Sequence, residues 1–523
     1  MNDTTRELLL ELVTEELPPK ALHALGQAFA QNVHSVLHDL ALLDDDCVCT
    51  DFATPRRLAV HLSRVRAQAP ERSYSEKLMP ATIALDGTGA ATPALLKKLA
   101  AKGLGDLQVS ALARRNDGKQ DILYAEGKAP GALLADGLQQ ALDRALTHLP
   151  IPKVMQYQLP DGVQSVKFVR PAHRLIALWG ADVIPVQALG LKAGRDSMGH
   201  RFMGQPQLSI TSADTWAHQM QDQGMVQPSF PARRQDILEQ LHRQAESLGT
   251  TIDIDPDGDP EVLALLDEVT ALVEWPTVYV GSFDPAFLAV PPECLILTMR
   301  LNQKYFPLFD PVSGHLSQHF LIVSNMCPAD PRHIIEGNER VIRPRLADAQ
   351  FFYRTDLKTR LVDRVESLAD SIYHNKLGTQ LQRTERVRAL ARWLAPLLGA
   401  DPDHADRAAL LAHADLNTSM VGEFPELQGT MGAYYARADG EAPEVAQALR
   451  DQYRIRLDTA VTPDTLVAAV LFMAERAETL VGIWGIGLAP TGERDPFGLR
   501  RAAAGLRTGV CAGDGAAWLS QGF

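Results

Sequence analysis

The sequence predicts a multi-domain α+β protein, and three observations lead to this fold class. The chain has 523 residues, well beyond the roughly 250–300 residues at which a single hydrophobic core stops growing. Up to about residue 330, segments that alternate like half-buried strands are mixed with segments of helical period. From Asn338 to Leu488 nearly every segment follows a helical period. We therefore expect a mixed α/β N-terminal half followed by an all-helical region.

The first predicted region, residues 1–150, is α+β. Its opening segment is apolar at both helical and alternating spacings, and Pro18 and Pro19 end the element before them. Residues 21–40 have one apolar helical face, and residues 56–65 alternate like a strand. Residues 93–104 predict a short helix that closes at Gly103.

The second predicted region, residues 151–330, is α+β and rich in strands. Strand patterns occur at residues 165–180 and 183–191, and a helical pattern follows at residues 219–248. Acidic residues, glycine and proline at 253–260 predict a turn-rich connection.

The third predicted region, residues 331–500, is helical, and its boundary with the second falls near residues 330–338. A long amphipathic pattern at its start predicts a buried stripe formed by Phe351, Phe352, Leu361, Val365 and Leu368. Residues 501–523 lose helical periodicity, so we expect an irregular C-terminal tail.

Composition indicates a soluble cytoplasmic chain. There is no apolar run of about 18 residues that would span a membrane, and the N-terminus lacks the basic segment of an export signal. The five cysteines are an odd number without zinc-site spacing, which favours reduced thiols. The net charge of −13 restricts any contact with nucleic acid to a local basic surface.

Two motifs invite a catalytic interpretation, and neither is complete. Gly487 and Gly492 have the spacing of a phosphate-binding loop, but Glu493 and Arg494 follow where such a loop needs lysine and a hydroxyl residue. These glycines therefore predict a turn between helices. The sequence also contains no G-x-S-x-G nucleophile motif, and we predict no catalytic or cofactor-binding residue in this chain.

A metal site is the second incomplete motif. Candidate ligands occur in the helical region, and His413 and Asp415 resemble the His-Asp pair of HD-type phosphohydrolases, except that Ala414 separates them. Two residues so spaced diverge by about 200° on a helix. We predict an inert helical scaffold with no metal ligand, and an autonomous metal-dependent HD-type phosphohydrolase stays the alternative. The candidates considered are His404, His413, Asp415, Glu475 and Glu478.

A basic cluster interleaved with aromatic residues begins near residue 340. Guanidinium groups pair with phosphate and aromatic rings stack on unpaired bases, so this composition suits RNA. Arg340, Arg343 and Arg345 are the candidates for RNA contact. Interspersed acidic residues leave a solvated face with ion pairs open as the alternative. Residues 299–309, with Arg300 and Lys304, show the same mixture. The full cluster comprises Arg340, Arg343, Arg345, Arg354, Lys358, Arg360 and Arg364 with Phe351, Phe352 and Tyr353.

Many unusual segments, in order from Leu8 to Ala503, resemble the β subunit of bacterial two-subunit glycyl-tRNA synthetases. They include FATPRRLAV, KFVRPAHRLIALWG, TMRLNQKYFPLFD, GNERVIRPRLADAQFFYRTD, DLNTSMVGEFPELQGTMGAYYA and LVGIWGIGLAPTGERDPFGLRRAA.

The resemblance implies the β chain of an α2β2 ligase that attaches glycine to tRNA(Gly). The complex uses ATP and magnesium, and the active site lies mainly on the α subunit. This chain would then bind no cofactor itself and would chiefly support tRNA binding.

The resemblance also implies tRNA-binding modules in the N-terminal half, akin to those of the phenylalanyl enzyme's β subunit, and an HD-like helical domain after residue 331. Family members continue into a helical anticodon-binding domain, whereas this sequence ends at Phe523. We therefore expect the chain to pair with the α subunit but to bind tRNA weakly.

Overall fold

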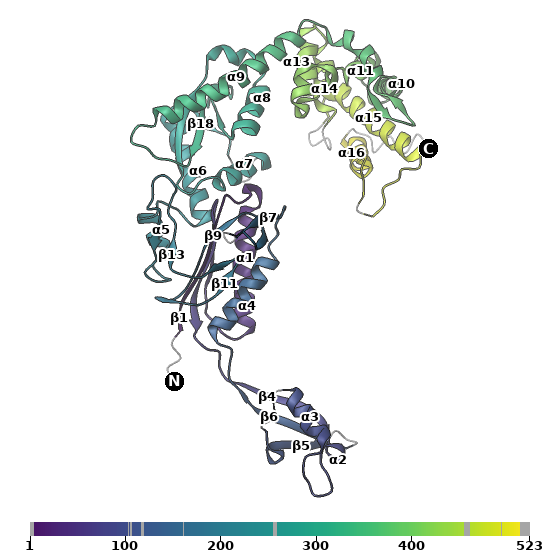
Figure 1. The fold of residues 1–523 in the computed structure, drawn as a ribbon. Coiled ribbons are helices and arrows are strands. Elements are labelled where there is room, and N and C mark those ends of the chain that lie inside the picture. The colour runs from purple at the N-terminus through teal and green to yellow at the C-terminus, as the bar shows by residue number, and fades with distance from the viewer. Residues whose placement is uncertain are drawn as a thin grey trace. The chain divides into compact units, whose positions relative to one another are not determined.

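The computed structural model describes residues 5–102, 104, 107–116, 120–159, 162–254, 259–453, 461–492 and 494–512. The chain forms two compact units, each discontinuous in sequence (Figure 1). The first unit comprises residues 1–247, 253–279 and 323–331, and the second comprises residues 248–252, 280–322 and 332–523. The fold is α+β, with antiparallel sheets and many helices.

A five-stranded antiparallel sheet organises the first unit, in the order β10-β9-β1-β3-β2. The predicted boundary at residue 150 runs through this sheet, because β1 pairs with both β3 and β9. The strands are β1 (Thr5–Thr14), β2 (Cys49–Thr54), β3 (Arg57–Arg66), β9 (Ala172–Trp179) and β10 (Asp182–Val183).

Strand β1 contributes side chains to the apolar cores on both faces of the sheet. Leu8, Leu10 and Leu12 pack with helices α1 (Pro19–Asp39) and α4 (Leu134–Thr147), which lie side by side in Figure 1. Leu9 and Val13 point to the other face, where they pack with helix α5 (Trp216–Asp222). Period-2 alternation thus buries apolar side chains on both faces, which explains the nearly continuous apolar run.

The other elements of the first unit flank this sheet. Strand β3 and helix α1 confirm the predictions for residues 56–65 and 21–40. The predicted turn at 253–260 falls largely outside the described residues. The remaining elements are β7 (Met155–Gln158), β8 (Ser165–Phe168), β11 (Gln187–Ala188), β12 (Leu191–Lys192), β13 (Asp196–Ser197), β14 (Leu208–Ser209), α6 (Phe230–Ser247) and α7 (Pro260–Thr270).

A small module with its own core is inserted between β3 and α4. Its three-stranded sheet has the order β4-β6-β5. Leu78, Leu95, Leu99 and Leu123 are among the apolar side chains that fill its core. Its elements are β4 (Arg72–Pro80), α2 (Ala81–Ala84), α3 (Pro93–Ala101), β5 (Leu112–Asn116) and β6 (Asp121–Ala129). Helix α3 confirms the short helix predicted there, and its predicted closing residue, Gly103, lies outside the described residues.

A four-stranded antiparallel sheet in the order β15-β17-β18-β16 belongs mostly to the second unit, which excludes residues 277–279 of β16 and 323–324 of β18. The strands are β15 (Thr251–Ile252), β16 (Thr277–Ser282), β17 (Phe306–Phe309) and β18 (Leu316–Ser324), and helix α8 spans Pro292–Leu297. Helix α9 (Arg332–Asp356) follows and is the longest helix among the described residues.

The rest of the second unit is helical except for a short hairpin, β19 (Ile372–His374) and β20 (Gly378–Thr379). The expectation of an all-helical region is therefore wrong at this point, because Gly378, at a φ of +91°, closes a tight turn. The helices are α10 (Gln380–Leu398), α11 (Pro402–Leu411), α12 (Ser419–Glu423), α13 (Thr430–Ala438), α14 (Pro443–Asp451), α15 (Leu466–Gly485) and α16 (Leu499–Ala512).

Helix α16 corrects the expectation of an irregular tail for residues 501–512. The carboxylate of Asp495 accepts hydrogen bonds from the backbone N–H groups of Leu499 and Arg500 and so caps the first turn. The apolar residues Leu499 and Ala502 are buried. This cap lies before residue 501, outside the segment that predicts an irregular tail. Residues 513–523 lie outside the described residues.

Candidate nucleic-acid interface

Helix α9 carries the three arginines that the sequence predicts to contact RNA. Ile342, Leu346 and Ala349 are buried and recur at helical spacing, so they fix one face of the helix against the unit. Arg340, Arg343 and Arg345 are exposed. On an ideal helix Arg343 lies about 60° from Arg340 and Arg345 about 140° from it. Ideal helical geometry therefore groups Arg340 with Arg343 and places Arg345 on another flank.

The charges of these arginines are not neutralised within the described part of the chain. There, no carboxylate lies within ion-pair distance of Arg340, Arg343, Arg345 or Arg354. Arg360 and Arg364, from the same predicted cluster, instead pair with Asp363 and Asp356.

Two acidic residues of the cluster bind groups outside it. Glu339 accepts hydrogen bonds from the backbone N–H and the hydroxyl of Ser282 at 2.8 and 2.9 Å. Asp356 is buried and accepts bonds from the N–H groups of Ser419 and Met420. The ion pairs of the alternative, a solvated face, therefore occur between Arg360 and Asp363 and between Arg364 and Asp356. Arg340, Arg343, Arg345 and Arg354 have no such partner among the described residues.

The aromatic residues of the cluster differ from the predicted buried stripe. Leu361, Val365 and Leu368 are buried as predicted, but Phe351 is 63% exposed and Phe352 is half-buried. The prediction was wrong because α9 ends at Asp356 and a 3₁₀ helix, Leu361–Asp370, follows, so one helical period does not connect the two segments.

The second mixed segment, residues 299–309, offers no aromatic platform. Tyr305 and Phe306 are buried, and the Tyr305 hydroxyl donates to Asn338 Oδ1 at 2.6 Å. These rings belong to the core of the second unit.

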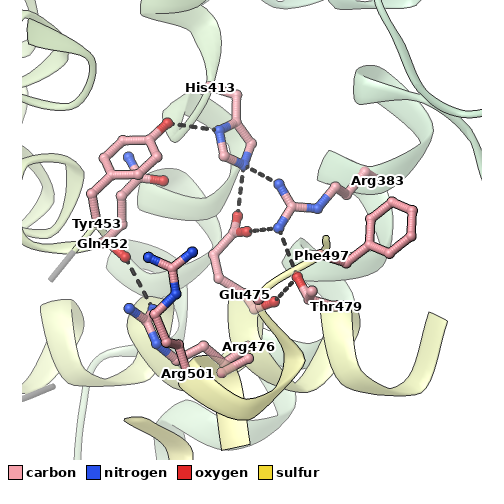
Figure 2. Close-up of a pocket in the computed structure, with 11 residues that line it drawn as sticks. Arg383, His413, Gln452, Tyr453, Glu475, Arg476, Thr479, Phe497 and Arg501 are labelled. Carbon is pink, nitrogen blue, oxygen red and sulfur yellow. Dashed lines mark hydrogen bonds and ion pairs between the residues drawn. The ribbon is translucent and has the colours of Figure 1, made fainter. Parts of the chain in front are cut away.

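Three candidate metal ligands, His413, Glu475 and Glu478, form part of a buried ionic cluster between α10, α15 and the segment around His413. Figure 2 shows the His413 ring between Tyr453 and Glu475, with the Arg383 guanidinium beside it. His413 Nε2 lies 2.9 Å from both Glu475 Oε1 and Arg383 Nη1. Arg383 also donates to Glu475, and its Nε donates to Glu478 at 3.0 Å. A guanidinium therefore sits among the nitrogen and oxygen atoms that would surround a metal ion.

Charge pairing keeps Glu475 and Arg383 ionised. Burial raises the pKa of Glu475, but Arg383 and His413 together outweigh it and hold the pKa at about 2. Burial likewise opposes the charge of Arg383, yet Glu475, Tyr373 and Glu478 raise the pKa of its guanidinium. The cation is thus permanent and offers no vacant coordination position.

Asp415 does not join His413 in one ligand set. Its Oδ2 accepts hydrogen bonds from the N–H groups of Gly429 and Gly432 at 2.6 and 3.0 Å. Its Oδ1 is buried and has no hydrogen-bond partner among the described residues. Burial raises the pKa of Asp415 to about 6. His404 is half-buried near the start of α11, and within the described ranges no group of three or more His, Cys, Asp and Glu side chains could hold a metal.

A cavity of about 330 Å³ opens beside this cluster. Arg476 and Arg501 line it together with Phe497. Burial lowers the pKa of Arg476 to about 10, against the attraction of Glu475. The nearby Gly487 and Gly492 have φ angles of +86° and +53°, which confirms the predicted turn.

Sequence reasoning missed Arg383 and the exposure of Phe351. The (i, i+3) pair Glu475 and Glu478 on α15 signals a cation partner, but the partner is 92 residues away from Glu475 and no local pattern identifies it.

No helix in the described part of the chain is long and apolar enough to span a membrane.

Comparisons with known proteins give one consistent result. A family model described as glycyl-tRNA synthetase beta subunit matches residues 8–516. The glycine--tRNA ligase beta subunits of Janthinobacterium sp. (strain Marseille) and Ralstonia nicotianae are each 53% identical, over 96% and 95% of this chain and 71% of their own lengths. That of Dechloromonas aromatica is 51% identical over 96% of this chain and 71% of its own length. The chain belongs to the glycyl-tRNA synthetase β subunit family.

Proposed function

We propose that this chain is the β subunit of a glycine–tRNA ligase and that, with an α subunit, it attaches glycine to tRNA(Gly) using ATP. The observation that carries the proposal is the family match, which covers residues 8–516 and so extends through both units. Identity of about half of all positions over nearly the whole chain supports the same reading.

We assign the adenylation and transfer chemistry, with its ATP and magnesium, mainly to the α subunit and tRNA binding to this chain. The exposed arginines of α9 support this division, because they supply unpaired positive charge for phosphate on a chain of net charge −13. The proposed assembly is an α2β2 heterotetramer. Its compartment would be the cytoplasm, where protein synthesis uses charged tRNA.

At finer detail, we propose that the helices around His413 form an HD-like domain and that the N-terminal half carries tRNA-binding modules akin to those of the phenylalanyl enzyme. The packing of α10, α11 and α15 beside His413 and Glu475 supports the first proposal. Nothing in the comparisons favours an autonomous phosphohydrolase, and Arg383 fills the space that its metal would need.

Glycylation of tRNA(Gly) by the α subunit alone, and then with this chain added, tests the proposal. We expect little charging by α alone, a large increase when the chain is added, and co-elution of the two chains in size-exclusion chromatography. A chain that co-elutes with α but leaves charging unchanged would overturn the proposal, as would a failure to co-elute.

A further inference from the structure

The exposed face of α9 combines one aromatic ring with several unpaired cations. Relative to Arg340, an ideal helix places Phe351 at about 20° on one flank and Arg354 and Arg343 at about 40° and 60° on the other, all on the side away from buried Ile342. Arg340 and Arg354 lie about 21 Å apart along the axis, with Phe351 between them. The ring therefore has guanidinium groups on both sides along the helix.

The Phe351 ring is held in place but not covered. The Phe352 ring meets it edge-on, with centroids 6.0 Å apart and an interplanar angle of 63°. Phe351 nevertheless remains 63% exposed. A single exposed apolar side chain is common on protein surfaces. The distinguishing feature here is its place among three arginines that have no ion-pair partner in the described ranges.

We propose that Phe351 stacks on an unpaired base of RNA while Arg340, Arg343 and Arg354 contact the flanking phosphates. The inference rests on the proposed function and specifies which part of tRNA this face receives, a single-stranded segment. Aromatic side chains bind unpaired bases through stacking, and arginines bind the backbone through charge. Bases within a duplex are already stacked and leave no face for the ring.

Charge favours RNA over a protein partner as the occupant of this face. Aromatic residues and arginine are common at protein–protein interfaces, but the aspartate and glutamate that would neutralise these arginines are depleted there. A protein covering Phe351 would have to supply carboxylates to three guanidinium groups that lie within about 60° of one another. RNA supplies one phosphate for every nucleotide.

Phe202 provides a matched control. It is 70% exposed and lies next to an arginine, but Arg201 is paired with Glu15 and Glu16. An exposed ring beside a neutralised arginine should not bind RNA. Comparing Phe351 with Phe202 therefore shows whether RNA binding needs unpaired arginines near the ring or only an exposed ring.

The first experiment measures tRNA(Gly) affinity of the complex with α across a range of salt concentrations. Phe351→Ala should weaken binding roughly tenfold and leave the slope of log affinity against log salt unchanged, because the substitution removes no charge. Phe351→Trp should retain the affinity, and Phe202→Ala should match the unsubstituted chain. Circular dichroism checks that all variants fold alike. Unchanged affinity in Phe351→Ala, or loss of α co-elution in that variant, would overturn the stacking proposal.

The second experiment identifies the RNA element. Single-stranded and fully paired RNA oligonucleotides with equal numbers of phosphates compete for the complex. The unsubstituted chain should prefer the single strand, and Phe351→Ala should abolish that preference. If the unsubstituted chain and Phe351→Ala preferred the single strand to the same extent, the stacking proposal would be contradicted. The proposed function would still be supported if the complex charged tRNA. A complex that fails to charge tRNA but prefers single strands through Phe351 would contradict the proposed function alone.

Discussion

At the scale of single residues, Arg383 determines whether the ionic cluster is stable. Its guanidinium binds both Glu475 and Glu478, which are buried. Replacing it with methionine keeps much of the volume but leaves the two carboxylates without this cation. Breaking a buried ion pair on one side costs about 3–5 kcal/mol. We therefore expect Arg383→Met to lower the thermal unfolding midpoint of the second unit clearly, as measured by differential scanning calorimetry.

Arg392 provides the control for that measurement. It is a more exposed arginine on the same helix, where it pairs with the exposed carboxylate of Asp403. Exposed pairs contribute about 0–1 kcal/mol, so Arg392→Met should leave the midpoint nearly unchanged. Equal midpoints for Arg383→Met and Arg392→Met would show that the buried pairing contributes little.

Unlike Arg383, the buried Asp415 does not stabilise the folded protein at neutral pH. Burial raises its pKa in the folded protein to about 6, above the ordinary value of 3.8. The folded state therefore retains a proton that the unfolded chain loses, and the resulting stabilisation is complete below about pH 4 and is lost as the pH rises through 6. Above pH 6 the buried carboxylate is charged, and its Oδ1 has no partner among the described residues.

Asp415→Asn should remove this pH dependence. The amide oxygen can accept from the N–H groups of Gly429 and Gly432 as Oδ2 does now. We expect the unfolding midpoint of the variant to change little between pH 4.5 and 7.5, apart from the effects of other groups, and to exceed that of the unsubstituted chain at pH 7.5. A variant that is less stable at both pH values would contradict the prediction.

At the scale of elements, the sequence predicts those whose pattern is local. Helix α1 and strand β3 each have a clear period, and the structure confirms both. The apolar pattern that predicts α9 continues beyond the end of the helix, and it wrongly predicts that Phe351 is buried. The period alone does not reveal that α9 ends at Asp356, whose carboxylate caps α12 through contacts that are distant in sequence.

The geometry of α9 ranks the three arginines predicted to contact RNA. Only one side of a helix can face a given RNA surface, and ideal helical geometry places Arg345 about 140° from Arg340. Arg340→Ala and Arg343→Ala should each weaken tRNA binding and reduce its salt slope by about 0.7–0.9, as expected for one lost phosphate contact. Arg345→Ala should have a smaller effect on both. Equal reductions in all three variants would contradict the ranking.

At the scale of the whole molecule, the boundaries between regions depend on pairings that the sequence does not reveal. The boundary predicted near residue 150 separates β1 from β9, although Leu10 of β1 pairs with Ala177 of β9. Similarly, residues 280–322 belong to the same unit as the helices after residue 332. Composition and period change along the chain, but they do not indicate which distant strands share a sheet.

The small module of β4, β5, β6, α2 and α3 should be removable without unfolding the first unit. The segments that enter and leave the module are already paired, since the N–H of Ala69 donates to the carbonyl of Ala132 and Gln68 forms an isolated β-bridge with Leu133. Among the residues that the structure describes, the module's core shares no side chain with the two cores around the five-stranded sheet.

We therefore expect a variant in which an Asn-Gly turn replaces residues 70–131 to fold. Its unfolding midpoint should lie within about 4 °C of the full chain's, because the two sheet cores stay intact. Leu138→Asp serves as the control, because Leu138 is fully buried in the core beside β1 and its replacement should unfold this unit. Loss of the cooperative transition in the deletion variant would show that the sheet depends on the module. Co-elution of the deletion variant with the α subunit then measures whether the module takes part in assembly.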